Sequence, residues 1–407
     1  MKIGPSVQLK AGPQGATRFG HPWIYKNQVK DVAGAPEPGQ LVRVLGERGI
    51  VGLGYYNPRS EIAVRLLCRG AAESGATVDA AFFRERIERA AAFRRRNVSE
   101  TNAWRLVSSE ADGLPGLIVD RYGEVLVVQF LTQGMERLKD AVIAALEEAS
   151  PSRGIFERSD SGSRRLEGLE DRVGWIRRDC GDSVEIVEGE IRCEVRFGEG
   201  HKTGFYLDQR ENRLLFGQLA KQEAAAQAPR TPEALDAFCY EGGFSLHLAA
   251  AGFNVLGIDI QPEVLARAEE NRRLNGLDAR IEFRAADVFD ELKALEKGGR
   301  RFDFVVLDPP SFVKKKSAVE GALAGYKEIL LRGMRLLREN GRLAVFSCSY
   351  HVDENLLMQS AMAAAYDVRR SLRVLKFLKQ SADHPINPFI PETYYLKGFL
   401  FEVSTGF

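Results

Sequence analysis

Short apolar strands alternate with helices through the C-terminal half of this 407-residue chain. The predicted strands are 235–240, 255–260, 281–285, 304–307 and 342–347, and the predicted helices between them are 244–251, 263–275, 288–296 and 325–339. Repeated strand–helix units joined by short turns predict a parallel, doubly wound sheet. Ligands of such sheets bind beyond the carboxyl ends of the strands. The residues at those ends are therefore the first candidates for function.

Acidic residues occupy the ends of four consecutive predicted strands, at Asp236, Asp259, Asp287 and Asp308. A carboxylate at such a position costs desolvation unless it has a partner, so four in a row point to a ligand. Asp259 can bind both hydroxyls of an adenosine ribose. Asp287 is placed to meet an adenine amino group. The pattern predicts a site for an adenosine-containing cofactor.

The turn after the first strand contains Gly242 and Gly243, within DAFCYEGGFS. Glycines permit a tight turn and let a ligand approach the backbone at a helix N-terminus. The motif is not GxGxxG, which weakens a dinucleotide interpretation. Neutral-to-acidic strand ends suit a cationic sulfonium better than a pyrophosphate. The sequence therefore predicts S-adenosylmethionine as the cofactor.

The fifth predicted strand ends in Ser347-Cys348-Ser349. A lone Cys is usually a small buried hydrophobe, but Cys348 stands at the open end of the sheet. The neighbouring predicted loop contains Lys314–Lys316, whose charge would favour the thiolate form of a nearby Cys. These lysines are also candidates to contact phosphates. Cys348 is therefore the predicted nucleophile.

A small basic module precedes this region. Residues 1–70 contain 10 Lys and Arg against 4 Asp and Glu, although the net charge of the whole chain is only +1. Strand-like runs at 40–45, 50–56 and 61–67, separated by turn residues, predict a β-barrel. Cations and aromatics that can hold phosphates and stack bases are Arg18, His21, Trp23, Tyr25 and Lys26.

Three domains are expected from the length of the chain and from the change of pattern along it. They are a β-barrel at 1–72, an α+β middle domain at 73–182 and the doubly wound α/β domain at 183–407. The middle domain is predicted to contain helices at 79–96 and 135–148, the first with Asp79 as its N-cap. A polar, Ala-rich stretch at 221–234 is interpreted as a linker or a frayed helix end.

The motifs DAFCYEGGFS, GIDI, AADVF, LDPPSF and FSCS, in this order, resemble a Rossmann-fold S-adenosylmethionine-dependent methyltransferase. With HKTGFYLDQRENR at 201–213, they resemble the ribosomal RNA large-subunit methyltransferase I family. Members of that family begin with a PUA domain, an RNA-binding β-barrel, which GHPWIYKNQV at 20–29 and GYYNPRSEIAVRLL at 54–67 resemble. EADGLPGLIVDRYG at 110–123 resembles the middle domain, and DHPINPFIPETYYLKG at 383–398 the C-terminal hairpin.

This resemblance implies methylation of carbon 5 of a cytosine in 23S ribosomal RNA, with Cys348 as the nucleophile. Phe312 of the Asp308-Pro-Pro-Ser-Phe motif would stack the flipped base. The residues that would line the cofactor site are Phe205, Gln209, Arg213, Asp236, Tyr240, Gly242, Gly243, Phe244, Asp259, Asp287, Asp308 and Pro309.

Several alternatives stay open. The base that removes the carbon 5 proton is Asp308, Asp383 or His384, since the DPPS motif lacks the second Cys of another cytosine-5 methyltransferase family. A DPP[YF]-type loop also serves methylation of a base nitrogen, which needs no nucleophile. A non-catalytic RNA-binding assembly factor and a small-molecule methyltransferase are the remaining readings of the sequence.

Composition limits the compartment and the partners. The 5 Cys residues form no CxxC pair, which indicates a reducing, cytoplasmic environment without a disulfide framework or a zinc site. No apolar run reaches the roughly 18–20 residues that span a bilayer. The expected partner is ribosomal RNA, with no metal and no membrane. The oligomeric state is not fixed by the sequence, and a homodimer stays open.

Overall fold

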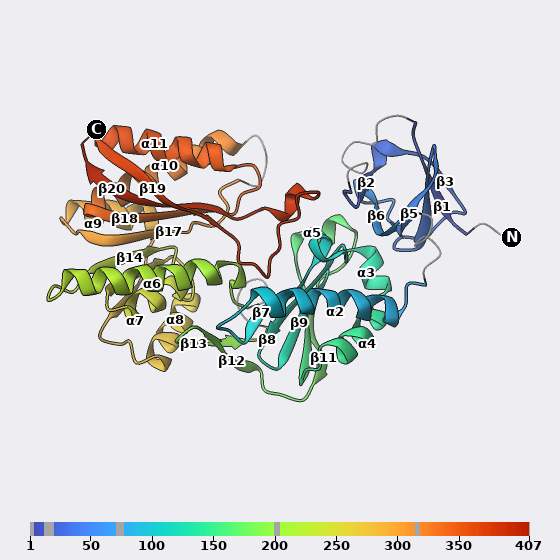
Figure 1. Cartoon of the computed structure of the whole chain (residues 1–407), viewed down its shortest axis with the longest axis horizontal. Coiled ribbons are helices and arrows are strands. Elements are labelled where there is room, and N and C mark those ends of the chain that lie inside the picture. Colours follow the sequence, from blue (N-terminus) through green and yellow to red (C-terminus); the bar gives the residue numbers. More distant parts are fainter. Residues whose placement is uncertain (1–3, 12–19, 71–76, 199–203, 314–317, 407) are drawn as a thin grey trace. The chain divides into compact units, whose positions relative to one another are not determined.

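The computed structural model describes residues 4–11, 20–70, 77–198, 204–313 and 318–406 (Figure 1). The chain divides into two units. The first is bounded by Met1–Ile186, Val195–Leu207 and Ala382–Thr393, and the second by Val187–Glu194, Asp208–Ser381 and Tyr394–Phe407. Each unit is therefore assembled from segments that lie far apart in the sequence.

Six strands of the first unit form one mixed sheet in the order β2–β6–β5–β4–β1–β3. Their bounds are β1 Ser6–Leu9, β2 Trp23–Tyr25, β3 Val29–Ala33, β4 Leu41–Gly46, β5 Gly49–Tyr56 and β6 Ile62–Arg69. Side chains alternate across a strand, so Ile24 is buried in the core while Trp23 and Tyr25 on either side are not. The three strands predicted individually are β4, β5 and β6.

A second sheet of this unit has the order β11–β10–β9–β8–β7. Its strands are β7 Ala103–Ser108, β8 Leu117–Tyr122, β9 Val125–Phe130, β10 Gly154–Ser159 and β11 Arg172–Arg178. The helices are α2 Ala80–Asn97, α3 Gln133–Arg137, α4 Lys139–Ala149 and α5 Gly162–Leu166. Asp79 caps α2 as predicted, accepting from Phe82 N at 3.1 Å. The helix predicted at 135–148 is present but interrupted, since Leu138 lies outside helical geometry and separates α3 from α4.

One hydrophobic cluster joins the two sheets of the first unit, while the six-stranded sheet has a second cluster of its own that contains Ile24. Leu53 and Tyr55 of β5 pack in the same cluster as Phe83 of α2. The Tyr55 hydroxyl donates to the Pro115 carbonyl at 2.6 Å, and the buried Arg65 forms an ion pair with Glu167 at 2.8 Å. Shared apolar packing joins the first two predicted domains into one unit, and the boundary near residue 72 stays a prediction.

The second unit is built on a seven-stranded sheet in the order β16–β15–β14–β17–β18–β20–β19. Its strands are β14 Glu233–Ala237, β15 Asn254–Asp259, β16 Ile281–Ala285, β17 Phe302–Leu307, β18 Leu337–Ser347, β19 Arg370–Lys379 and β20 Lys397–Thr405. The first five are parallel, and β20 is antiparallel to β18 and β19. The predicted α/β fold class is confirmed, with β19 and β20 added to the predicted strands.

Helices cover both faces of this sheet. Figure 1 shows α6, α7 and α8 on one face and α9, α10 and α11 on the other. Their bounds are α6 Arg210–Gln227, α7 Gly243–Ala250, α8 Pro262–Leu274, α9 Val288–Lys297, α10 Val319–Leu336 and α11 Glu354–Val368. The stretch predicted from residue 221 as a linker or a frayed helix end is helical over its first half, because α6 continues to Gln227. Its Ala, Gln, Glu and Lys residues are good helix formers. β12 Ser183–Glu188 and β13 Ile191–Arg196 form a separate two-stranded sheet.

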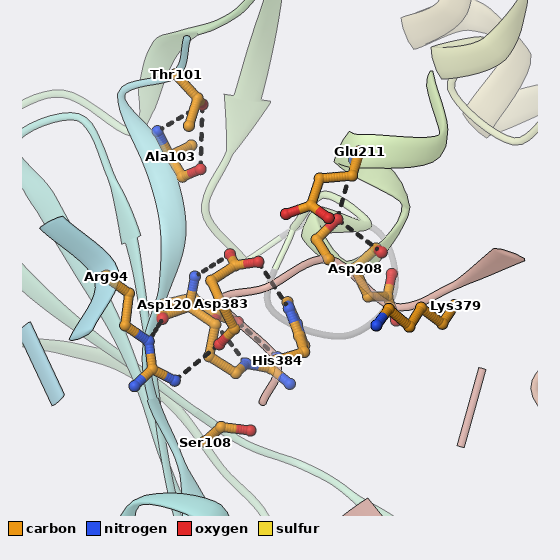
Figure 2. Close-up of polar contacts among 12 residues, drawn as sticks. Arg94, Thr101, Ala103, Ser108, Asp120, Asp208, Glu211, Lys379, Asp383 and His384 are labelled. Atoms are coloured by element: carbon orange, nitrogen blue, oxygen red, sulfur yellow. Dashed lines mark hydrogen bonds and ion pairs between the residues drawn. The ribbon is translucent and has the colours of Figure 1, made fainter. Parts of the chain in front are cut away.

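The side chain of Arg94 connects three segments of the first unit (Figure 2). Its guanidinium donates to Asp112 Oδ1 at 2.6 Å, to the Arg105 carbonyl at 2.8 Å and to the Asp383 carbonyl at 2.7 Å. Only 1% of Arg94 is exposed. This buried cation therefore attaches the segment Ala382–Thr393 to α2 and to the region around β7.

Replacing Arg94 with Met should destabilise the first unit by about 3–5 kcal/mol, because the buried Asp112 carboxylate loses its counter-charge. Thermal unfolding of the full chain measures this loss. The matched control is Arg95→Met, since the neighbouring Arg95 is exposed. Equal melting temperatures for the two variants would contradict the assigned role of Arg94.

Candidate functional site

The carboxyl ends of the parallel strands bring the predicted acidic residues to one edge of the sheet. Asp236 lies in β14 and pairs in register with Gly257 of β15, and Asp259 is the last residue of β15. Asp308 follows β17 directly. Because parallel strands all end on the same side, these carboxylates belong to one region of the second unit. That region is the candidate site.

One carboxylate oxygen of Asp236 is a buried hydrogen-bond acceptor without a donor among the described residues. Its Oδ2 accepts from Ser245 N at 2.9 Å and from Ser245 Oγ at 2.7 Å. Its Oδ1 is buried and, within the described residues, accepts no hydrogen bond. Burial, with a smaller contribution from Asp259, raises the pKa of Asp236 to about 6. A buried acceptor of this kind is suited to a ligand that donates a hydrogen bond or carries positive charge.

The turn between β14 and α7 has a strained backbone. Phe238 and Tyr240 have positive φ angles of 66° and 50°, which non-glycine residues rarely adopt. Gly242 has φ 79°, and a Cβ there would lie 2.7 Å from Cζ of Phe283. Tyr240 N donates to Asp259 Oδ2 at 3.0 Å, which ties the turn to the end of β15. The glycine is therefore required both for the turn and for the close packing beneath it.

Asp259 and Asp287 have structural roles in addition to their predicted roles in binding. The second oxygen of Asp259 accepts from Gln261 N at 3.0 Å, so both oxygens hold backbone amides. Asp287 is exposed and caps α9, accepting from Asp290 N at 3.2 Å. The capping role was not considered in the sequence analysis, although an Asp before a helical run indicates it.

Gln209 and Asp308, predicted to share the cofactor site, are in direct contact. Gln209 Nε2 donates to Asp308 Oδ2 at 2.9 Å, and Asn212 Nδ2 donates to Gln209 Oε1 at 2.6 Å. Gln209 is buried just before α6, and Pro309 is also buried. The start of α6 therefore meets the loop that follows β17.

Arg213 is neutralised by a carboxylate that the sequence analysis did not identify. Its Nε and Nη2 donate to the two oxygens of Glu188, each at 2.6 Å, and His247 Nε2 lies 3.0 Å from Glu188 Oε1. Burial alone would raise the pKa of Glu188, but Arg213 and His247 outweigh it and bring the value to about 2. A Cβ at Gly243 would lie 2.9 Å from Cδ of Arg213. Arg213 thus supports the glycine turn from below.

Two aromatic candidates have partners that indicate packing roles. Phe244 stacks on Phe346 with ring centroids 5.6 Å apart, inside the core. Phe205 lies in the first unit, where its backbone N donates to the Tyr122 hydroxyl at 3.2 Å. Their predicted contacts with the cofactor stay predictions.

The Cys348 thiol is exposed in the loop that follows β18. Next to it, Ser349 Oγ lies 2.9 Å from Ser311 Oγ of the DPPS loop, so the two loops meet. Tyr326 of α10 is buried nearby, and burial raises its pKa to about 12, with further contributions from Cys348 and Asp308. The predicted nucleophile therefore lies at the same strand-end region as the acidic residues.

Phe312, expected to stack a flipped base, lies in an aromatic cluster of the second unit. Its ring centroid is 5.0 Å from that of Tyr326, 6.1 Å from that of Phe289 and 6.5 Å from that of Phe238. Phe312 is only half-buried. Part of the ring therefore stays accessible from solvent.

The predicted RNA-binding residues of the first unit have different surroundings. His21 is buried, with Nε2 2.9 Å from Glu392 Oε2, and the half-buried Trp23 donates from Nε1 to Glu110 at 2.9 Å. Tyr25 is 40% exposed, and Lys26 Nζ makes surface contacts with Glu61 Oε1 and with the Arg59 carbonyl, each at 3.4 Å. Arg18, Lys314, Lys315 and Lys316 lie outside the described residues.

Asp383 and His384, two candidates for the base, belong to the first unit (Figure 2). Asp383 Oδ2 accepts from Arg105 N at 2.8 Å, and its Oδ1 lies 3.2 Å from His384 Nδ1. Both residues are buried. These bonds assign them a structural role in holding the segment 382–393.

Within the described residues, the chain contains neither a membrane-spanning helix nor a set of metal ligands. None of its helices combines the length and apolar character that a bilayer crossing requires. Across residues 4–11, 20–70, 77–198, 204–313 and 318–406, His, Cys, Asp and Glu form no cluster able to hold a metal ion.

Two family models match this chain, one in its N-terminal part and one over most of the remainder. A family model for a PUA-like domain matches residues 7–69. A second model, for an S-adenosylmethionine-dependent methyltransferase, matches residues 131–401 and therefore includes the whole candidate site.

Full-length relatives have the same extent as this chain. Ribosomal RNA large subunit methyltransferase I of Shewanella frigidimarina is 38% identical over 404 residues, covering 98% of this chain and 99% of that protein. The protein of that name from Tolumonas auensis is 38% identical over 387 residues, covering 93% and 94%. Among solved structures, the methyltransferase SMU.776 complexed with SAH has a TM-score of 0.80 at 18% identity, covering 98% and 99%. The last likeness shows the fold.

The pKa of Asp236 predicts a pH dependence of stability in the ligand-free protein. Its folded value of about 6 exceeds the ordinary 3.8, so its stabilising contribution is complete below about pH 4 and is lost as the pH rises through 6. Asp236→Asn should therefore gain about 3 kcal/mol relative to wild type between pH 4 and pH 8. Urea unfolding at the two pH values measures the gain. The exposed Asp278→Asn is the control, and an equal gain in both variants would refute the assignment.

Proposed function

The chain belongs to the ribosomal RNA large subunit methyltransferase I family of S-adenosylmethionine-dependent methyltransferases, and we propose that it methylates carbon 5 of a cytosine in 23S ribosomal RNA. The reaction would take place in the cytoplasm and use Cys348 as a covalent nucleophile. The observation that carries this proposal is the exposed Cys348 thiol at the carboxyl end of β18.

The cofactor fits the strand-end region of the second unit. S-adenosylmethionine, when bound, supplies an electrophilic methyl group on a cationic sulfur. The buried Oδ1 of Asp236 offers an acceptor for a donor group of the ligand. Asp259 would bind the ribose hydroxyls, and the turn at Gly242 would let the ligand approach the backbone. Gln209 and Asp308, already hydrogen-bonded to each other, would border the same region.

Cytosine carbon 5 is too weak a nucleophile to take a methyl group unaided. In the proposed route the Cys348 thiolate bonds to carbon 6, and the π electrons of the C5–C6 bond make carbon 5 enamine-like. Carbon 5 would then bond to the methyl group, while the bond from the donor sulfur to that methyl breaks and its electron pair stays on the sulfur. A base removes the carbon 5 proton, the electron pair restores the double bond, and the bond from sulfur to carbon 6 breaks to release Cys348 as a thiolate.

Asp308 is the best supported of the three candidate bases. It follows β17 in the loop that meets the Cys348 loop through Ser311 and Ser349. Its Oδ2 accepts from Gln209, and a carboxylate oxygen keeps further lone pairs for a proton. Asp383 and His384 are buried in the hydrogen bonds of the first unit.

Binding of RNA is proposed to involve two exposed residues of the first unit, Tyr25 at the end of β2 and Lys26 directly after it. Their neighbours His21 and Trp23 hold Glu392 and Glu110 and would support the surface from within. The positive charge of this module suits a polyanion. Phe312 is proposed to stack the target base on its accessible part.

Removal of one phosphate-binding charge should weaken RNA binding and its dependence on salt. Lys26→Ala is expected to reduce the slope of log affinity against log salt by about 1. Filter binding of ribosomal RNA fragments at several salt concentrations gives this slope. Lys293→Ala, on the surface of α9, is the control. An unchanged slope in Lys26→Ala would exclude Lys26 from the interface.

The chemistry is tested by the product and by one substitution. Unmodified 23S ribosomal RNA incubated with the protein and labelled S-adenosylmethionine should yield 5-methylcytidine, identified by mass spectrometry. Cys348→Ala should lower kcat by a factor of at least about 1,000, because the covalent route is lost. Cys180→Ala, a half-buried Cys of the first unit, should retain activity.

Two outcomes would contradict the proposal in different ways. A methylated base nitrogen as the product would replace carbon 5 chemistry and leave the cofactor assignment intact. Full activity of Cys348→Ala would exclude the covalent adduct.

A further inference from the structure

Lys397 is a buried lysine placed beside the Cys348 loop. It is the first residue of β20, and its backbone pairs in register with Ser347, the residue before Cys348. Its Nζ lies 3.5 Å from the carbonyl oxygen of Ser349, the residue after Cys348. The backbone and the ammonium of one residue therefore flank the nucleophile on both sides.

The environment of this ammonium is unusual for a lysine. Only 6% of Lys397 is exposed, whereas lysine is almost never buried without a charged partner. Its hydrogen bonds go to two carbonyl oxygens, of Ser349 and of Tyr395 at 3.3 Å, and its Nζ lies 5.5 Å from the ring centroid of Tyr394. Within the described residues, no carboxylate forms an ion pair with it.

The nearest carboxylates are engaged elsewhere. Asp353 caps α11 by accepting from Leu356 N at 2.9 Å, and Glu354 accepts from the Tyr394 hydroxyl. Burial lowers the pKa of Lys397, while Asp353, Cys348 and Glu354 oppose that effect. Asp353 and Glu354 act on this cation but already accept hydrogen bonds from other groups, and the remaining group acting on it that can become an anion is the Cys348 thiol.

We propose that Lys397 is a positioning residue that holds the Cys348 loop in place and stabilises Cys348 as a thiolate. This inference rests on the proposed function, in which Cys348 attacks the pyrimidine. A positive charge close to a thiol raises the thiolate fraction at neutral pH, and the thiolate is the attacking form. Lys397 keeps its own protons throughout and needs no contact with the RNA base.

Other ionisable groups face the same two residues and must be considered in any pH profile. Around Lys397 they are Asp353 and Glu354 at the start of α11 and Tyr394 before β20. Around Cys348 they are Asp308 after β17 and Tyr326 of α10. Three of these five groups are carboxylates, and their negative charge disfavours a thiolate. The positive charge of Lys397 has the opposite effect and favours the thiolate form of Cys348.

The test measures the thiol directly and does not depend on RNA. Iodoacetamide labelling of Cys348 in the full chain is followed from pH 5 to pH 10 by peptide mass spectrometry. Lys397→Met removes the charge, Lys397→Gln keeps a donor for the carbonyl oxygens without the charge, and Lys397→Arg keeps the charge. Lys376→Met is the matched control, since Lys376 is an exposed lysine of β19.

The Met and Gln variants should shift the labelling midpoint upward by about one pH unit, which reduces labelling at neutral pH about tenfold. Lys397→Arg and Lys376→Met should label as wild type does. If Lys397→Met does not fold, the difference in labelling midpoint between Lys397→Gln and Lys397→Arg tests the role of the charge. Midpoints equal to wild type in the Gln variant would overturn the role of Lys397.

Methylation assays separate this inference from the proposed function. If Lys397 acts through the thiolate, Lys397→Gln should lower kcat more than it changes KM, and higher pH should restore part of the rate. A shifted labelling midpoint in a protein whose Cys348→Ala variant is fully active would reject the covalent mechanism while leaving the coupling between Lys397 and Cys348 standing. Loss of activity in Cys348→Ala with an unshifted midpoint would reject only the role of Lys397.

Discussion

The buried ion pair between Glu188 and Arg213 fixes the geometry on which the ligand edge of the sheet depends. Both side chains are almost fully buried, and two bonds of 2.6 Å join them. Removing one partner would leave an uncompensated charge, at a cost of about 3–5 kcal/mol. His247 of α7 adds a third member, since its Nε2 lies 3.0 Å from Glu188 Oε1, so the cluster links α6 to α7. The pair therefore holds Gln209 against Asp308.

The sequence predicted the parts of the site that follow from strand order. Parallel strands end on the same side, so strand-end carboxylates such as Asp236 and Asp308 gather once the alternating pattern is recognised. Lys397 and His247 carried no such signal. Their partners lie 48 and 59 residues away, and no local periodicity relates residues at that separation. Contacts of this kind emerge only when the order of strands and helices is known in space.

Composition indicated a nucleic-acid surface but could not decide which side chains form it. The alternation of β2 buries Ile24, leaving Tyr25 exposed, whereas His21 is directed inward to Glu392, 371 residues away. The Ala-rich stretch at 221–227 shows that composition alone also left the secondary structure of a segment open. Its polar character favoured a linker or a frayed helix end, and its residues have high helix propensity and continue α6 as far as Gln227.

The return of residues 382–393 to the first unit has a consequence for synthesis. Arg94 cannot form its hydrogen bond to Asp383 until 289 further residues have been synthesised, and His21 likewise lacks Glu392 until the segment is made. At about 5–20 residues per second, the ribosome needs roughly 15–60 seconds to deliver that segment. Until that segment is made, the Arg94 guanidinium lacks the Asp383 carbonyl, one of its hydrogen-bond acceptors. A nascent chain that lacks residues 382–393 therefore cannot complete the first unit, and the residues synthesised first stay accessible to chaperones and proteases.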